Sequence, residues 1–323
     1  MVGNDAKLPV KILAGFLGSG KTTLVNRLLT EPNAGQLAVL VNEFGDVGID
    51  GRLVVAAEED LVELANGCVC CTVRGDLERG LVQLLERRSR LLRRAPFDGV
   101  LIEGSGLASP GPIAQTLQIV PELQAQLELA GIITLAHAGH IVGQLAQYPE
   151  AVDQVGYADL IVLNHADRAS AEELAAAERA LVEINHAATI FTTERARLDF
   201  ETLNGLQHRD LGDLPRVSVG EHKHTSGVTT LVLTSDEPLD IHRVKMWLRF
   251  LETRPDGEVL RIKGILACEG QGRPVVVQGV YQWLEIGPGE GPVPERSELV
   301  LIGKGFPKAE LERGWLAIRA GAF

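Results

Sequence analysis

The sequence predicts an α/β protein in which a mostly parallel β-sheet covered by helices is followed by a smaller α+β domain. Two observations support this fold class. In the first two thirds of the chain, short apolar runs alternate with stretches of helical periodicity, as in parallel strands joined by crossover helices. In the last third of the chain, predicted strands are adjacent to one another in sequence, as in an α+β domain. The length of 323 residues is consistent with two domains.

The first domain is expected to contain six short strands, each recognised as an apolar run of strand length. These runs are residues 10–14, 37–41, 98–102, 131–135, 160–163 and 189–192. Between them, the spacing of the apolar residues predicts three helices, at residues 21–29, 75–94 and 171–184. Strands and helices that alternate in this way indicate a parallel sheet with both faces covered.

The second domain begins after a polar, turn-rich stretch that is interpreted as a linker. Strands are expected at residues 228–234, 260–267, 274–280 and 298–302, with helices at 241–251 and 307–316. The predicted organisation is therefore a first domain over residues 8–215, a linker over 216–227 and an α+β domain over 228–323.

The composition limits the classes of partner. The formal net charge of −12 opposes long-range attraction to a phosphate backbone, so no nucleic-acid partner is expected. No apolar segment approaches the roughly 20 residues that a membrane span requires, so no membrane partner is expected. The apolar run after Pro9 leads directly into a glycine loop and is interpreted as a first strand, not a signal peptide. These features indicate a cytoplasmic protein.

The run from Gly15 to Thr22 matches the P-loop pattern G-x-x-x-x-G-K-[ST] in full, between a predicted strand and a predicted helix. Backbone N–H groups of such a loop curl around phosphates, the lysine reaches the β- and γ-phosphates, and the threonine hydroxyl is a ligand of Mg²⁺. The candidate nucleotide-binding residues of this loop are Gly15, Gly18, Ser19, Gly20, Lys21, Thr22 and Thr23. The sequence therefore predicts a site for a nucleoside triphosphate and Mg²⁺.

Two further segments complete the predicted nucleotide site. The apolar run before Glu103 suits a Walker B strand, whose acid holds Mg²⁺ directly or through water, and Gly106 could offer its N–H to the γ-phosphate. Lys21 and Glu103 are accordingly the candidate catalytic residues. After residues 160–163, Asn164-His165-Ala166-Asp167 is close to the N-K-x-D element of G proteins. Its Asp would accept hydrogen bonds from guanine, and its Asn would tie this loop to the P-loop, which favours GTP over ATP.

Three cysteines lie together at Cys68, Cys70 and Cys71. Clustered thiols outside a disulfide-rich secreted chain point to metal or redox chemistry, and thiolates bind Zn²⁺, Cu(I) and, less well, Co²⁺. Three ligands leave one coordination position open, which suits a site that loads and unloads its metal. Glu43 is a candidate ligand near the thiols, and Thr22 is the candidate ligand of Mg²⁺ in the P-loop. Buried structural cysteines and a redox dithiol are the alternatives.

The remaining histidines and the fourth cysteine receive simpler interpretations. His222 and His224 in the linker are candidates for delivering metal, or are solvated. Three further histidines are expected to have structural roles, namely His137, His140 and His186. Cys268 is expected to lie in a hydrophobic core.

Taken together, these motifs resemble those of the CobW-type GTPases, which are relatives of the nickel-insertion proteins UreG and HypB. The resemblance covers nearly the whole chain. It is carried by Gly15 to Thr23, Asn42 to Asp50, Asn66 to Thr72, Glu103 to Pro110, Arg261 to Leu266 and Val277 to Val280. The chain departs from the family pattern at Gly104, at Ser109, at Ala136-His137-Ala138 and at His165, which stands where the lysine of N-K-x-D is expected.

The resemblance implies a GTPase that carries a transition metal, Zn²⁺ or Co²⁺, to a client metalloprotein or a metal-insertion pathway. The resemblance leads to the hypothesis that binding of the γ-phosphate moves the segment from Asn42 to Thr72 as a switch. This movement would bring the three thiols into positions where they can bind a metal ion together. Intrinsic hydrolysis should be slow, because neither an arginine finger nor a catalytic glutamine is evident. A P-loop small-molecule kinase and a non-catalytic, GTP-dependent scaffold for metalloenzyme assembly are the alternatives. The sequence leaves homo-oligomerisation open.

Overall fold

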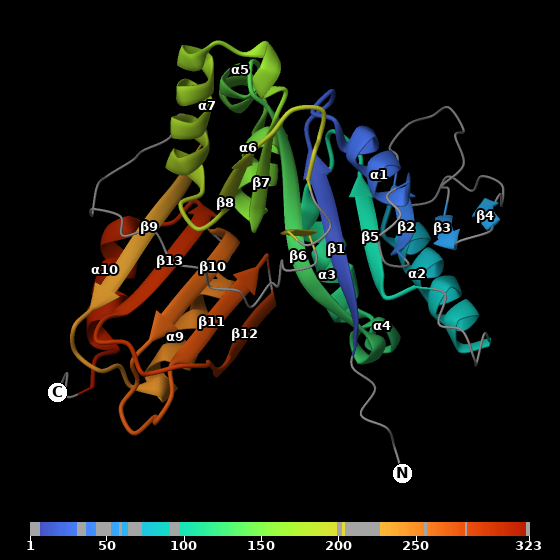
Figure 1. Cartoon of the computed structure of the whole chain (residues 1–323). Helices are drawn as coiled ribbons and strands as arrows, with labels where there is room; N and C mark the ends of the chain where they lie inside the picture. The colour runs from blue at the N-terminus through green and yellow to red at the C-terminus, as the bar shows by residue number, and fades with distance from the viewer. Residues whose placement is uncertain are drawn as a thin grey trace. The chain divides into compact units, whose positions relative to one another are not determined.

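A computed structural model gives the fold of this chain (Figure 1). The structure describes residues 7–30, 37–42, 53–57, 60–63, 73–90, 97–198, 202–203, 227–254, 257–281 and 283–320. Among these residues, no helix is both long enough and apolar enough to cross a membrane. The chain divides into two compact units. The first comprises Met1–Gln154, Ala158–Glu178 and Thr189–His208, and the second comprises Val155–Tyr157, Arg179–Ala188 and Arg209–Phe323.

The first unit is built on an eight-stranded sheet with the order β4-β3-β2-β5-β1-β6-β7-β8 (Figure 1). The neighbouring strands in the part of the sheet ordered β2-β5-β1-β6-β7-β8 are all parallel. The pairs β2–β3 and β3–β4 are antiparallel. The strands are β1 (Leu8–Gly15), β2 (Leu37–Asn42), β3 (Leu53–Ala57), β4 (Asp60–Glu63), β5 (Gly99–Gly104), β6 (Leu127–His137), β7 (Leu160–Asn164) and β8 (Thr189–Thr192). The predicted mostly parallel sheet is confirmed, and β3 and β4 are additions that the sequence did not suggest.

Among the described residues, seven α-helices and one 3-10 turn lie between residues 21 and 184. They are α1 (Lys21–Thr30), α2 (Val73–Arg90), α3 (Pro110–Ile119), α4 (Pro121–Gln126), α5 (Ile141–Gln147), α6 (Pro149–Tyr157), η1 (Ala166–Arg168) and α7 (Ala171–Ile184). Helices α1, α2 and α7 were expected. The predicted helix at 75–94 corresponds to α2, and residues 91–94 lie outside the described residues. The four helices between residues 110 and 157 were missed.

One core cluster of the first unit forms where α1 packs on the sheet. Leu24, Val25 and Leu28 of α1 point into a cluster with apolar residues of β1, β2, β5, β6 and β7. Strand β1 lies at the centre of the sheet and is almost wholly buried, with Val10, Ile12 and Leu13 fully covered. A buried central strand fixes where its C-terminal end lies, and the P-loop follows that end directly.

The second unit contains a five-stranded antiparallel sheet in the order β12-β11-β10-β13-β9. The strands are β9 (Val228–Ser235), β10 (Glu258–Leu266), β11 (Val275–Val280), β12 (Trp283–Pro288) and β13 (Ser297–Lys304), and the helices are α9 (Ile241–Thr253) and α10 (Lys308–Ala317). A smaller α+β domain is therefore confirmed, with β12 as an unexpected edge strand. The core between this sheet and its helices includes Cys268, as expected.

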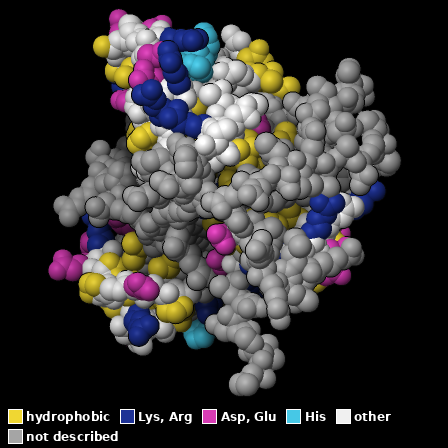
Figure 2. All heavy atoms as spheres, turned by 45° about the vertical axis from the view of Figure 1, so that its right-hand side comes forward, with side chains coloured by type: hydrophobic (Ala, Val, Ile, Leu, Met, Phe, Trp, Pro, Cys, Tyr) yellow, Lys and Arg dark blue, Asp and Glu magenta, His cyan; other side chains and the backbone are white. Residues whose placement is uncertain are grey.

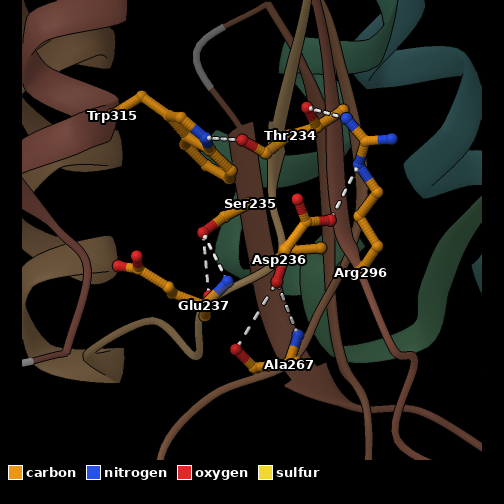
Figure 3. Close-up of polar contacts among 8 residues, drawn as sticks. Thr234, Ser235, Asp236, Glu237, Ala267, Arg296 and Trp315 are labelled. Carbon is orange, nitrogen blue, oxygen red and sulfur yellow. Dashed lines mark hydrogen bonds and ion pairs between the residues drawn. The ribbon is translucent and has the colours of Figure 1, made fainter.

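Polar contacts hold the end of β9 to its surroundings (Figure 3). The Trp315 indole N–H of α10 donates to the carbonyl oxygen of Thr234 over 2.9 Å. Arg296 donates to the Thr234 hydroxyl over 2.7 Å and pairs with Asp236 at 3.4 Å, and both of these charged side chains are exposed. The Trp315 contact is partly buried and joins α10 to the end of β9, whereas the two Arg296 contacts are exposed.

Candidate nucleotide site

The P-loop lies between the C-terminal end of β1 and the first turn of α1. The Ser19 N–H donates to the Phe16 carbonyl over 3.2 Å, which closes a turn inside the loop. The N–H of Leu24 donates to the Gly20 carbonyl over 3.0 Å, the start of the α1 hydrogen-bond ladder. The loop therefore delivers its backbone directly to a helix N-terminus, where free N–H groups and the helix dipole favour an anion.

Gly20 shows why this loop needs a glycine. Its φ of +106° lies in a region that L side chains rarely adopt. A Cβ atom there would also collide with the side-chain Nδ2 of Asn164. The loop can therefore keep its shape beside Asn164 only with glycine at this position.

The Lys21 ammonium folds back onto the loop. Its Nζ donates to the Gly15 carbonyl over 2.6 Å and lies 3.4 Å from that of Phe16. Burial lowers the pKa of Lys21, and the negative charge of Glu103 partly opposes that effect. The Ser19 hydroxyl in the same loop is buried and has no hydrogen-bond partner among the described residues. A buried, unpartnered hydroxyl in the same loop as an ammonium group is a polar arrangement that a phosphate would complete.

Glu103 lies beside the start of α1 because β5 pairs with β1 in parallel, with Glu103 opposite Leu13. The Thr22 hydroxyl donates to the Glu103 carboxylate over 3.2 Å. Glu103 is buried, whereas Thr22 and Thr23 are exposed. A hydroxyl and a carboxylate brought together here are hard oxygen donors of the kind that Mg²⁺ prefers, so these residues fit that cation.

Gly106 follows β5 and lies against the P-loop. A Cβ atom on it would stand 2.5 Å from Cδ2 and 3.0 Å from the backbone N of Leu17. The buried Gln154 side chain donates to the carbonyl oxygens of Gly106 over 3.2 Å and Ala108 over 3.0 Å, which holds this turn in place. The segment after Glu103 is therefore in contact with the loop that would hold the phosphates.

Asn164 joins the P-loop to the end of β7, as the motif predicted. Its Nδ2 donates to the Ser19 carbonyl over 2.9 Å, and its Oδ1 accepts the Ala196 N–H over 2.8 Å. Asp167 lies in the following 3-10 turn with its side chain exposed. The contribution of Ala196 was missed, because a backbone N–H leaves no mark in the sequence.

His165 stands between these two residues in the left-handed conformation, with φ 61° and ψ 31°. Its ring stacks on His137, and the ring of His137 stacks on His140. Figure 2 shows histidine side chains at the surface beside Lys and Arg side chains near the top of that view. The sequence suggested only a structural role for His137 and His140, without indicating that they meet His165.

The predicted metal ligands Cys68, Cys70, Cys71 and Glu43 lie outside the described residues, as do His222 and His224. Among the residues that the structure describes, no group of three His, Cys, Asp or Glu side chains is arranged to hold a metal ion.

Comparison with known proteins supplies the family context. Residues 9–192 match the model of the CobW/HypB/UreG nucleotide-binding domain, and residues 228–319 match that of the cobalamin synthesis protein cobW C-terminal domain. The chain is 33% identical over 323 residues to the zinc chaperone YjiA of Escherichia coli (strain K12), covering 97% of this chain and 99% of that protein. It is also 33% identical to the zinc chaperone CobW of Pseudomonas aeruginosa, over 85% of this chain and 81% of the relative.

A solved structure agrees with these sequence matches. The crystal structure of the Zn(II)-bound YjiA GTPase from E. coli superposes with a TM-score of 0.73 at 31% identity, covering 98% of this chain and 100% of that one. The similarity therefore extends over both units of the fold.

Proposed function

This chain belongs to the CobW-type GTPase family, and we propose that it is a metallochaperone that binds GTP, holds a transition-metal ion at Cys68, Cys70 and Cys71, and delivers it to a client protein. The proposed cargo is zinc or cobalt. We place the GTPase domain at residues 8–215, a linker at 216–227 and the C-terminal domain at 228–323. We further propose that the protein acts in the cytoplasm, on a client metalloprotein or metal-insertion pathway.

The observation that carries the nucleotide part is that Lys21 and Thr22, at the start of α1, meet Glu103, near the end of β5. Thr22 and Glu103 are hydrogen-bonded, and Glu103 acts electrostatically on Lys21. Lys21 would exchange its carbonyl partners for the β- and γ-phosphates of GTP, while Thr22 and Glu103 would hold Mg²⁺. When bound, that ion would neutralise charge on the phosphates. Such a site stabilises a phosphoryl-transfer transition state mainly through positioning and charge.

The choice of GTP is supported by the loop after β7. Asn164 fixes this loop to the P-loop, so Asp167 follows at a defined position two residues beyond the ring of His165. An exposed carboxylate there would accept hydrogen bonds from the N1 and N2 groups of guanine, whereas adenine offers no matching pair of donors.

The metal part rests on ligand chemistry. Three thiolates within four residues suit a borderline-soft ion, and Glu43 is the proposed neighbouring ligand. The two relatives described above are named zinc chaperones, which supports zinc as the first ion to test. Cys268 makes a useful contrast, because it is buried in the second core, and burial together with the negative charge of Asp240 raises the pKa of its thiol to about 11. A buried protonated thiol is a poor metal ligand.

The decisive experiment measures the coupling between nucleotide and metal. The dissociation constants of Zn²⁺ and Co²⁺ are determined with GDP and with a non-hydrolysable GTP analogue. The triphosphate should tighten metal binding by about 5- to 150-fold, and metal should tighten binding of the analogue by the same factor. A Cys68→Ser, Cys70→Ser, Cys71→Ser variant should lose the metal response, whereas Cys268→Ala should keep it. Equal metal affinities in both nucleotide states would refute the coupled metallochaperone.

A further inference from the structure

Three histidine rings form one continuous stack beside the proposed nucleotide site. The ring centroids of His137 and His140 are 4.1 Å apart with an interplanar angle of 27°. Those of His137 and His165 are 4.3 Å apart with an angle of 24°. His137 is therefore the middle ring, covered on one face by each of the other two.

The stack is placed by the sheet. His137 is the last residue of β6 and pairs in register with Asn164, the last residue of β7. The N–H of Ala138 donates to the Asn164 carbonyl over 2.9 Å, which ties the two strand ends together. His140 precedes α5, and its N–H donates to the His137 carbonyl over 3.0 Å. The rings thus gather at the carboxyl ends of parallel strands, where ligands of α/β sheets bind.

The backbone directs His165 toward the P-loop. A residue other than glycine in the left-handed conformation is uncommon and carries a conformational cost, so it points to a positional requirement. The Nε2 atom of His165 lies 3.8 Å from where a Cβ atom of Gly20 would stand. One end of the stack is therefore adjacent to the last glycine of the phosphate loop.

We propose that His137, His140 and His165 form a ring surface on which the nucleotide base stacks, with His165 touching the base and the other two holding its ring in place. This inference rests on the proposed function, because it assigns new residues to the GTP site. The flat face of an imidazole can replace the aliphatic stem of the lysine expected in N-K-x-D. Aromatic faces bind bases by stacking with little dependence on base identity.

The two supporting rings give His165 a defined orientation before the base arrives. An isolated histidine can rotate about two side-chain torsions, whereas stacking on His137 restricts that motion and lowers the entropy lost on binding. The His137 ring is itself fixed, because the Gly139 N–H donates to its Nδ1 over 3.2 Å. Burial, together with the charges of His165, His140 and Arg168, lowers the pKa of His137 to about 4, so the middle ring is neutral at pH 7.

A metal centre is the other role that three histidines suggest. Rings stacked face to face present their nitrogens at the ring edges and not toward a common point. No such convergent group exists among the residues that the structure describes. The geometry therefore favours a stacking surface over a metal site.

The test compares GDP with tripolyphosphate, which has no base, by calorimetry on the full chain. His165→Ala should weaken GDP by about 10-fold and leave tripolyphosphate unchanged, whereas His165→Phe should stay within about twofold of the original protein. His137→Ala should weaken GDP by a smaller factor, and His137→Phe should restore it. His242→Ala, which changes an exposed histidine of α9, is the matched control and should have no effect.

Two outcomes would overturn the proposal. In the first, His165→Ala binds GDP with the same affinity as the unmodified protein. In the second, His165→Ala loses affinity for GDP and for tripolyphosphate by the same factor, which would mean that the substitution had only disrupted the loop. A failure of the proposed GTPase function would give a different result from a failure of the stacking proposal. In that case the unmodified chain would not bind GDP, or Lys21→Ala would leave GDP binding unchanged.

Discussion

Asn164 donates a hydrogen bond from its side-chain Nδ2 to the carbonyl oxygen of Ser19 over 2.9 Å, across 145 positions of sequence. The side chain is 1% exposed, and its Oδ1 is also used, by the N–H of Ala196. This one carboxamide therefore fixes the P-loop to the end of β7 and to the turn after β8.

We predict that Asn164→Ala destabilises the nucleotide-free protein. The substitution leaves a buried carbonyl and a buried N–H without their partner, at about 1–3 kcal/mol for each group. Urea denaturation followed by fluorescence gives the loss. Asn26→Ala, on the exposed side of α1, is the control and should change little. An unchanged denaturation midpoint for Asn164→Ala would show that the contact contributes nothing to stability.

Glu103→Gln should separate nucleotide binding from the use of Mg²⁺. The amide keeps the size of the side chain and an oxygen for the Thr22 hydroxyl, but it removes the negative charge that a divalent cation needs. GTP hydrolysis should fall by at least about 10-fold, and half-maximal GTP binding should require more Mg²⁺. Titration of MgCl₂ against a fluorescent GTP analogue measures this. Asp98→Asn changes an exposed carboxylate just before β5 and should leave the Mg²⁺ requirement as it was.

Gly106→Ala should weaken GTP more than GDP. The added Cβ atom would press on Leu17 at two places, the flexible side chain and the backbone N, and only the first can move away cheaply. We therefore expect the turn after β5 to shift from the P-loop, on the side proposed to sense the γ-phosphate. Competition binding with both nucleotides tests this. Gly143→Ala is the matched control, because nothing lies within 4 Å of its added Cβ. Equal losses for GTP and GDP would remove the γ-phosphate role.

His137 should make the protein less stable in acid. Its pKa falls from 6.5 to about 4 in the folded chain, first because of burial and then because of the charges of His165, His140 and Arg168. Between those two pH values the unfolded chain binds more protons than the folded one, so stability decreases as the pH falls from 6.5 to 4. Above pH 6.5, His137 is neutral in both the folded and the unfolded chain and does not lower the free energy of unfolding.

The measurement compares His137→Phe with the unmodified protein by urea denaturation at several pH values from 7 to 4. The difference in free energy of unfolding should move in favour of the variant as the pH falls through this window. His242→Phe supplies the reference curve for an exposed histidine outside the stack. Parallel pH curves for His137→Phe and the unmodified protein would contradict the shifted pKa.

The sequence was most informative where a function depends on consecutive residues. The P-loop, the acid at Glu103 and the tie from Asn164 to the loop were all predictable, because each motif specifies its own backbone setting. The stack of His137, His140 and His165 was not predictable, because it depends on how two loops meet at the end of β6 and β7. The Ala196 N–H was also hidden, since any residue could supply it.

The missed elements have physical causes as well. Helices α3, α4 and α6 begin at Pro110, Pro121 and Pro149, and a proline in the first turn is a start signal that the spacing of apolar residues does not contain. They are also short, so their apolar spacing is weak. Strand β12 is a partly exposed edge strand with intermediate burial along most of its length, which gives no buried apolar run to detect.

The distance in sequence between Ser19 and Asn164 has a consequence for synthesis on the ribosome. The phosphate loop emerges first, yet the carboxamide that holds it is translated 145 positions later, after β5 and β6 have been made. Parallel pairings over such separations form slowly. A nascent chain that stops before Asn164 would therefore carry the complete P-loop motif without the support for its shape, and we expect it to gain little protection from GTP against proteolysis.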